Sequence, residues 1–238
     1  SPVLAEQAVY GKWPADGVLS GVAFGDGSGL RPGYPRLTRC GWGVVVFRHG
    51  VGVVAEAHGA LAGWLQETPL AESYAFLFVW THAAFHVDFV TDCELVLRTF
   101  EGGPSRSSSG WFKYSGVWKR IWARIADLGL SNVKVRWVPS HVAVGDARLS
   151  GLDKLLNDRA DVLAAKGSAS QPSDEGVLSK HAAAVKVVTS AARFVTSASL
   201  RLAGRDAVAI KRPAGHGGFK VRKGPRPAPL TANHAEYW

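Results

Sequence analysis

The order of apolar segments along the chain is the feature that most limits its fold. Three apolar runs, at residues 19–26, 40–50 and 51–63, follow one another with turn residues between them, a pattern typical of short strands. From residue 68 onward, helical patterns alternate with two further apolar runs, at residues 86–91 and 133–138. This order predicts an α/β fold: a five-stranded mixed sheet, with three antiparallel and two parallel strands, flanked by helices.

Four helices are predicted around these strands. Thr68 suits the N-cap of the first, and Pro69 its first helical position, where a missing N–H costs nothing. Glu72 then lies one residue beyond the position of a capping box, so local capping does not explain it. The predicted helices are residues 69–82, 94–100, 114–128 and 152–166, with a flexible loop at 101–110.

Composition divides the chain into four predicted segments. Residues 1–18 have no sustained period and are predicted to be an irregular lead-in, followed by the α/β domain at 19–167. Residues 168–210 are predicted to extend the domain with an amphipathic helix, because apolar residues recur at three- and four-residue spacing. Residues 211–238 are basic and rich in Gly and Pro, so a disordered tail is predicted.

Positive charge is concentrated toward the C-terminus. Residues 1–166 carry 17 Lys and Arg against 15 Asp and Glu, whereas residues 167–238 carry 11 against 4. The second region supplies most of the formal net charge of +9 and would bind a polyanion such as a nucleic acid. A solvated, solubilising tail is the alternative interpretation.

Cysteine content and hydropathy indicate the compartment. Cys40 and Cys93 are too few for the disulfide framework of a small secreted domain, which favours a reducing environment. No apolar run approaches the roughly 20 residues of a membrane span, and the N-terminus lacks a signal-peptide pattern. We expect an intracellular protein of the nucleus or cytoplasm with no membrane partner. The chain has no methionine, position 1 included, so a piece of a longer product is expected.

Four acidic residues lie at the ends of these predicted elements or within them. Asp26 closes the run GVAFGD, Glu72 opens the helix TPLAESYAF, Asp92 ends the run VDFVTD, and Asp161 lies inside the helix LLNDRADVL. Each has a simpler interpretation when taken alone: a turn, a surface charge near a helix start, a helix cap, and a solvated helix face.

The positions of these acids nevertheless favour a common site. Asp26 and Asp92 are both predicted at the carboxyl ends of buried strands, where open α/β sheets place their ligands. Four gathered carboxylates could not stay unpaired in a medium of low dielectric constant. Mg²⁺ is a suitable partner, because it prefers oxygen ligands and keeps open positions for water and phosphate. The pattern therefore predicts metal-assisted cleavage of a phosphodiester.

Five short motifs follow one another over residues 21–166. They are DGS at 26–28, AE at 71–72, TD at 91–92, WVPSH at 137–141 and NDRAD at 157–161. In order, element type and spacing the set resembles the type 1 ribonuclease H family, as a cellular enzyme or as a domain of retroelement polyproteins. The resemblance does not extend to residues 167–238.

The resemblance implies endonucleolytic hydrolysis of the RNA strand of RNA–DNA hybrids. It implies two Mg²⁺ or Mn²⁺ ions bound by Asp26, Glu72, Asp92 and Asp161, with Asp26 expected to bridge them. The N-x-x-A-D pattern favours Asp161 over the nearby Asp158. His141 is implied in proton transfer or product release, although a solvated loop histidine is the alternative.

A stretch rich in Trp, Lys and Arg at residues 111–137 is expected to bind the DNA strand, as it does in the family. Trp111, Lys113 and Lys119 are the expected substrate contacts there, and phosphate contacts of this kind give affinity without sequence preference. Ser28 of the DGS motif is also expected at the substrate. Asn157, one turn before Asp161, is expected either to hold the substrate or to orient a carboxylate.

Two other functions remain open from the sequence. One is a non-catalytic module that binds hybrids or other nucleic acids, and the other is a DNA-directed nuclease of the wider ribonuclease-H-like superfamily. Hydrolysis of hybrids within a retrotransposon-like polyprotein, with a reverse transcriptase domain upstream, is the first expectation. A monomer is expected.

Overall fold

The computed structural model describes residues 7–30, 37–140, 142, 148–172 and 175–209. The chain forms two compact units, residues 1–180 and 181–238, which are considered separately. Among the described residues, no helix combines the length and apolar character that crossing a membrane requires.

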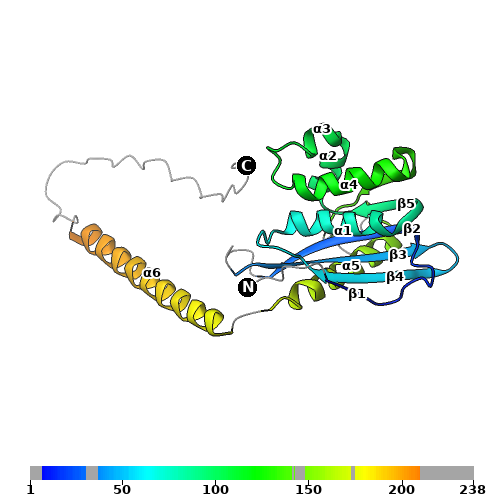
Figure 1. The fold of residues 1–238 in the computed structure, drawn as a ribbon. Helices are drawn as coiled ribbons and strands as arrows, with labels where there is room; N and C mark the ends of the chain where they lie inside the picture. Colours follow the sequence, from blue (N-terminus) through cyan, green and yellow to red (C-terminus); the bar gives the residue numbers. More distant parts are fainter. Residues whose placement is uncertain (1–6, 31–36, 141, 143–147, 173–174, 210–238) are drawn as a thin grey trace. The chain divides into compact units, whose positions relative to one another are not determined.

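The first unit is built on a mixed sheet with the strand order β1-β4-β3-β2-β5-β6 (Figure 1). Strands β2, β3 and β4 form the predicted antiparallel meander, and β5 and β6 are parallel to β2. The strands are β1 (Gln7–Tyr10), β2 (Leu19–Leu30), β3 (Arg39–Arg48), β4 (Gly52–Ala60), β5 (Ala83–Thr91) and β6 (Val133–Trp137). The predicted mixed sheet is therefore confirmed, with one strand more than the five expected.

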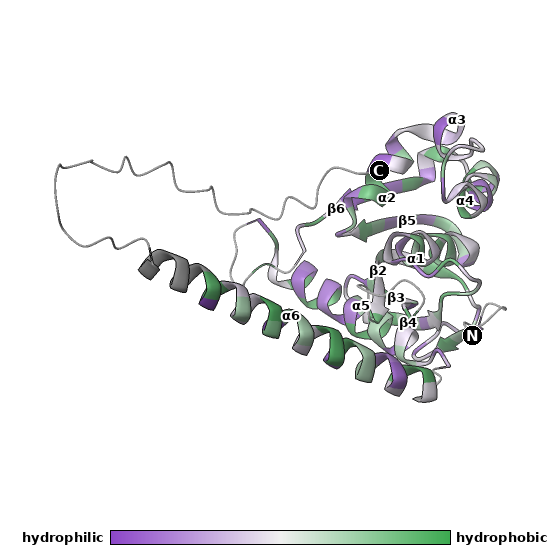
Figure 2. Ribbon diagram, turned by 90° about the vertical axis from the view of Figure 1, so that its left-hand side faces the viewer, coloured by the Kyte–Doolittle hydropathy of each residue, from purple (hydrophilic) through white to green (hydrophobic). Residues whose placement is uncertain are grey.

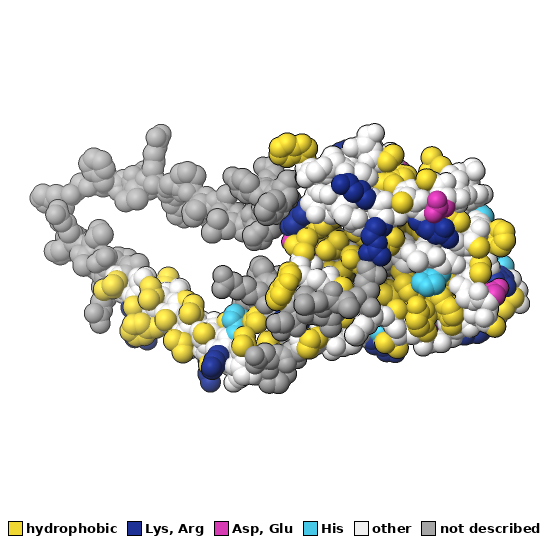
Figure 3. All heavy atoms as spheres, viewed as in Figure 1, with side chains coloured by type: hydrophobic (Ala, Val, Ile, Leu, Met, Phe, Trp, Pro, Cys, Tyr) yellow, Lys and Arg dark blue, Asp and Glu magenta, His cyan; other side chains and the backbone are white. Residues whose placement is uncertain are grey.

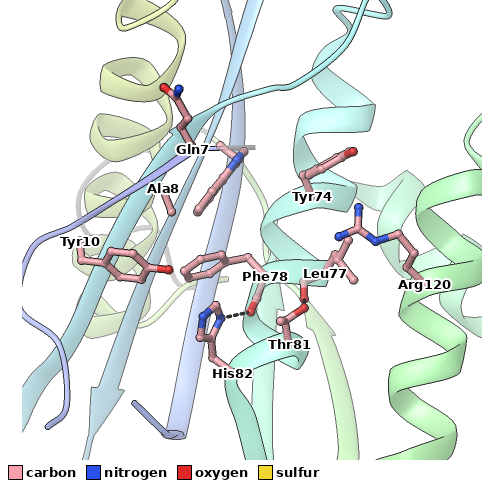
Figure 4. A pocket seen from close by; sticks show the side chains of 10 residues that line it. Gln7, Ala8, Tyr10, Tyr74, Leu77, Phe78, Thr81, His82 and Arg120 are labelled. Carbon is pink, nitrogen blue, oxygen red and sulfur yellow. Dashed lines mark hydrogen bonds between the residues drawn. The ribbon is translucent and has the colours of Figure 1, made fainter. Parts of the chain in front are cut away.

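The additional strand is β1, which lies in the predicted irregular lead-in. Four residues are too few to show a period, yet they pair with β4 in register, Gln7 opposite Ala60 and Tyr10 opposite Ala57. Aromatic contacts attach the segment to helix α1 (Thr68–His82), because the Tyr10 ring lies 6.0 Å from that of Phe78 (Figure 4). β1 thereby covers what would otherwise be a free sheet edge.

The described residues of the two units form six helices. They are α1 (Thr68–His82), α2 (Glu94–Glu101), α3 (Gly103–Ser107), α4 (Ser115–Leu128), α5 (Gly151–Ala169) and α6 (Glu175–Ala209), with a 3₁₀ turn at Leu130–Asn132. The predicted N-cap of α1 is shifted by one residue, since Glu67 occupies the N-cap and Thr68 is helical. The short helix α3 forms where a flexible loop was predicted, and the Ser107 hydroxyl stabilises it by donating to the Gly103 carbonyl.

Apolar side chains form one core on each face of the sheet. Helices α1, α2 and α4 cover the first face, where Phe76, Trp80, Phe89 and Trp118 are almost fully buried. Helix α5 covers the other face, and its Leu156, Ala160 and Leu163 pack against Phe24, Val45 and Val90. Successive side chains of a strand point to opposite faces of the sheet, and here both faces are covered by helices. The strand sequences are therefore nearly continuous apolar runs.

Helix α5 lies unusually close to the sheet. A Cβ atom on Gly43 of β3 would lie 2.4 Å from the backbone nitrogen of Ala164 and 2.5 Å from the carbonyl oxygen of Ala160. No larger residue fits there without moving the helix. The helix also continues beyond the predicted domain boundary at residue 167, and Ser168 and Gln171 are buried.

The described part of the second unit, residues 181–209, is helical and belongs to α6. Apolar and polar residues alternate along the helix (Figure 2), and many apolar side chains are exposed to solvent (Figure 3). The exposed large apolar residues are Val187, Val188, Phe194, Val195, Leu200 and Leu202. Helix α6 lies within residues 168–210, the region for which the sequence pattern predicts an amphipathic helix. The predicted tail at 211–238 lies outside the described residues.

Candidate metal site

Asp26 lies on the strand at the middle of the sheet. Strand β2 is flanked by β3 and β5, and Asp26 is opposite Gly43 of β3. The residue is only 7% exposed. A carboxylate on a paired strand inside the sheet is a fixed point around which other ligands can be arranged.

Glu72 reaches Asp26 because α1 packs directly on β2. A Cβ atom on Gly27 would lie 2.6 Å from the backbone nitrogen of Glu72 and 2.9 Å from the carbonyl oxygen of Thr68. Glycine is therefore required for the helix to approach the strand. The approach buries Glu72, which is 5% exposed, beside the carboxylate of Asp26.

Asp92 follows the last residue of β5 and is held by two neighbours. The Asn157 side-chain amide on α5 donates to Oδ2 of Asp92 at 3.1 Å. The Trp137 indole at the end of β6 donates to the Asp92 backbone carbonyl at 2.9 Å. Of the two roles expected for Asn157, the structure therefore supports the orientation of a carboxylate.

Asp161 and Asp158 both line the groove from α5. Asp161 is exposed, and its charge contributes to the raised pKa of Asp26. Asp158 forms an ion pair with Lys154 of the same helix at 3.0 Å. The two acids thus have different surroundings, since Asp158 has a cation beside it and Asp161 acts on the central carboxylate.

Three of the four predicted ligands form a tight group. One carboxylate oxygen from each of Asp26, Glu72 and Asp92 lies within 4.8 Å of the others. Asp161 lies at the wall of the same groove, which has a volume of about 350 Å³. The groove is lined by Asp26, Gly27, Ser28, Gly29, Thr68, Pro69, Glu72, Asp92, Cys93, Ser140, Asn157, Asp158 and Asp161.

The clustering of acids raises the affinity of the site for positive charge. Burial, followed by the charge of Asp92, raises the pKa of Asp26 from 3.8 to about 7, and a hydrogen bond from Glu72 partly offsets this rise. Burial, followed by the charge of Asp26, raises the pKa of Glu72 well above its usual value. Without a bound cation the site therefore retains protons near neutral pH.

The residues present fit a divalent cation. Oε2 of Glu72 is buried and has no hydrogen-bond partner among the described residues, an arrangement that is costly unless another group binds there. The donors are carboxylate oxygens, which hard cations such as Mg²⁺ and Mn²⁺ prefer. Asp26, Glu72 and Asp92 could hold one ion together, and Asp161 could complete a second position from the groove wall.

The predicted substrate contacts lie in several places. Ser28 lines the groove, Trp111 is 98% exposed, and Lys119 is exposed on α4. Lys113 instead forms an ion pair with Glu67 at 2.6 Å. His141 lies outside the described residues.

Glu67 is the residue of this region that sequence reasoning missed. Besides Lys113, it accepts a hydrogen bond from the Tyr114 hydroxyl at 2.8 Å. Burial, followed by this hydrogen bond, raises the pKa of Tyr114, so the phenol stays protonated and donates. No local pattern indicated these contacts, because Glu67 and its partners are 46 and 47 positions apart in the chain.

Comparisons with known proteins bear on the fold. No family model matches the chain, and a search of curated proteins gives no match. The solution structure of the prototype foamy virus RNase H domain is similar at a TM-score of 0.51 and 22% identity, covering 65% of this chain and 98% of that one. The crystal structure of prototype foamy virus protease-reverse transcriptase is similar at a TM-score of 0.51 and 20% identity, over 62% of this chain.

The chain has the ribonuclease H fold. The fold predicted from the motifs at residues 26–161 is therefore confirmed. The chain corresponds to only 20% of the length of the protease-reverse transcriptase. It matches nearly the whole of the isolated RNase H domain, so the similarity concerns one domain of the larger viral protein.

Proposed function

We propose that the chain hydrolyses the RNA strand of RNA–DNA hybrids with two divalent metal ions. One observation carries the proposal: the oxygens of Asp26, Glu72 and Asp92 lie within 4.8 Å of one another, in a groove that Asp161 also lines. Such a group is expensive to assemble, because buried carboxylates repel one another. The ribonuclease H fold supplies the reaction class by analogy.

The residues of the groove are proposed to have different roles in binding the cations and in positioning the ligands. When bound, divalent cations supply the positive charge that an attacking water and a leaving oxygen require at a phosphodiester. Asp26, fixed on β2, would be the shared ligand, with Glu72 and Asp92 on either side. Asn157 holds the Asp92 carboxylate in orientation through its side-chain amide. Asp161 is the exposed member and would face the incoming phosphate.

Substrate binding is proposed to use the exposed side of the first unit. Lys119 on α4 is available for phosphate contact, and the exposed Trp111 can lie against the nucleic acid. Lys113 would reach a phosphate only by exchanging its ion pair with Glu67. Ser28 lines the groove beside Asp26, where the 2′-hydroxyl that distinguishes RNA from DNA would be read. His141 is proposed to transfer protons or assist product release.

The protein context is proposed to be a retrotransposon-like product. The foamy virus structure that is similar to this chain is a protease-reverse transcriptase, which supports a reverse transcriptase domain as the partner. The hybrid that such a domain produces would be the substrate of the groove.

The test is hydrolysis of a duplex with a labelled RNA strand, in Mg²⁺, in Mn²⁺ and in excess chelator. We expect cleavage of the RNA strand of the hybrid that requires metal, and no cleavage of all-DNA duplex. Asp161→Asn should lower the rate at least about 100-fold, as loss of one electrostatic contact to a transition state commonly does. Asp158→Asn, on the same helix, is the matched control and should stay within about threefold.

Two results would favour the other functions. Cleavage of all-DNA duplex at a comparable rate would indicate a DNA-directed nuclease. Hybrid binding that persists in chelator, without cleavage in either metal, would indicate a non-catalytic binding module.

A further inference from the structure

Two tryptophan side chains are far more exposed than the others that the structure describes. Trp64, in the loop between β4 and α1, is 73% exposed, and Trp111, between α3 and α4, is 98% exposed. By contrast, Trp42, Trp80 and Trp118 are buried. Exposing a large indole forgoes the apolar burial that most tryptophans gain on folding, so the two positions call for an explanation.

The loop that carries Trp64 is held firmly at its base. The buried Gln66 side chain donates to the carbonyl oxygens of Leu61 at 2.9 Å and Gly63 at 2.7 Å, and it accepts from the Cys40 amide at 2.8 Å. Gln171, beyond α5, donates to Gln66 at 3.1 Å. Trp64 is therefore presented outward by a fixed loop.

The segment that carries Trp111 is anchored as well. The next residue, Phe112, packs against the main core, and its amide donates to the Ser109 carbonyl at 3.1 Å. The Phe112 and Tyr114 rings meet edge to face with centroids 5.6 Å apart. The backbone on both sides of Trp111 is thus fixed, while the indole itself is almost wholly in solvent.

The two segments are joined beside the groove. Glu67, three residues after Trp64, binds Lys113, two residues after Trp111, at 2.6 Å. It also accepts the hydrogen bond of Tyr114. The next two residues, Thr68 and Pro69, line the groove that holds the carboxylates. The ion pair therefore joins the segments that carry the two exposed indoles, at a point next to the groove of the candidate metal site.

We propose that Trp64 and Trp111 form a stacking surface for unpaired bases of a single-stranded extension that adjoins the hybrid duplex. This inference rests on the proposed function for the identity of the duplex. Bases inside a duplex are stacked on one another and have no free face for a side chain, whereas unpaired bases do. Stacking of a base on an aromatic side chain contributes about 1–3 kcal/mol and tolerates any sequence. The surface thus selects for single-stranded character and not for base identity.

The test compares two hybrids of equal duplex length, one blunt and one with a single-stranded extension of about six nucleotides. Affinities are measured by fluorescence anisotropy in chelator, so that binding does not depend on hydrolysis. Wild type should bind the extended hybrid at least about tenfold more tightly than the blunt one. Trp64→Ala and Trp111→Ala should each reduce this ratio at least about fivefold, and Trp64→Phe should retain most of it.

Phe85→Ala is the matched control, because Phe85 is 71% exposed near the start of β5, at the end of that strand away from Asp92. Its ratio should stay within twofold of wild type. The proposal is overturned if Trp64→Ala leaves the ratio unchanged, if Phe85→Ala reduces it equally, or if Trp64→Ala alters only the sedimentation coefficient, which would indicate a protein interface. Loss of hydrolysis with an intact binding ratio would instead refute the proposed function alone.

Discussion

Replacing Asp26 with Asn is expected to stabilise the metal-free protein at neutral and alkaline pH, although it should abolish catalysis. The folded state raises the pKa of this carboxyl from 3.8 to about 7, and therefore binds its proton more tightly than the unfolded chain does. Below about pH 4 the acid is protonated in both states and has no effect on stability. Between pH 4 and 7 only the unfolded state releases the proton, so the free energy of unfolding falls as the pH rises.

The size of the effect follows from the pKa. A rise from 3.8 to about 7 corresponds to about 4 kcal/mol of lost stability above pH 7, at about 1.4 kcal/mol per pH unit. Solvent and counterions reach one side of the groove and weaken the electrostatic penalty. We therefore expect Asp26→Asn to increase the free energy of unfolding by about 2 kcal/mol. For a unit of this size, that gain corresponds to about 4–8 °C in Tm.

Thermal unfolding in chelator, at pH 5 and at pH 8, measures this difference for wild type and variant. The stabilisation should be larger at pH 8 than at pH 5. Adding Mg²⁺ should raise the Tm of wild type and leave that of Asp26→Asn nearly unchanged. Asp158→Asn, an exposed acid paired with Lys154, should stay within about 0.5 kcal/mol of wild type. If Asp26→Asn is no more stable than wild type at pH 8 in chelator, the electrostatic account of the site is wrong.

Three further substitutions test how the site is built. Gly27→Ala should destabilise the protein by more than about 2 kcal/mol in urea unfolding, because its Cβ would lie 2.6 Å from the Glu72 nitrogen; wild-type stability would show that α1 can move away at little cost. Asn157→Ala should weaken Mg²⁺ binding about 10–100-fold by calorimetry, since Asp92 loses its orienting hydrogen bond, and an unchanged affinity would assign Asn157 to the substrate instead. Gln66→Leu should cost about 1–3 kcal/mol by leaving the buried Cys40 amide without its hydrogen-bond partner, a cost that a urea midpoint equal to that of wild type would rule out.

Much of the fold could be predicted from local patterns. The meander and the two parallel strands follow from apolar runs bounded by turn residues. The helix at residues 69–82 follows from Pro69 and from the apolar residues after it. These signals are short-range, and the structure agrees with them to within a few residues. Asp26 and Asp92 could be anticipated at one site because each closes an apolar run, and the topology makes the two strands β2 and β5 parallel neighbours. The strand β2 nevertheless continues to Leu30, so Asp26 lies within it and not at the predicted carboxyl end.

The remainder depended on contacts between distant parts of the chain. Strand β1 is defined by pairing with β4, and its four residues carry no periodic signal of their own. The pairing of Lys113 with Glu67 also joins residues that are far apart in the chain, so no local pattern predicts it. This pairing changes the expected role of Lys113. Sequence patterns indicated that Glu72 was not a simple cap, but its burial depends on the absence of a side chain at Gly27.

The hydrogen bonds of Gln171 and the pairing of β1 have a practical consequence for recombinant work. A fragment trimmed to residues 19–167 would lose the strand that covers β4 and the amide that bonds Cys40 and Leu61. Its bare β4 would invite strand addition between molecules, and its yield would suffer from precipitation. A fragment that begins before Gln7 and ends after Gln171 keeps both the pairing of β1 with β4 and the hydrogen bonds of Gln171.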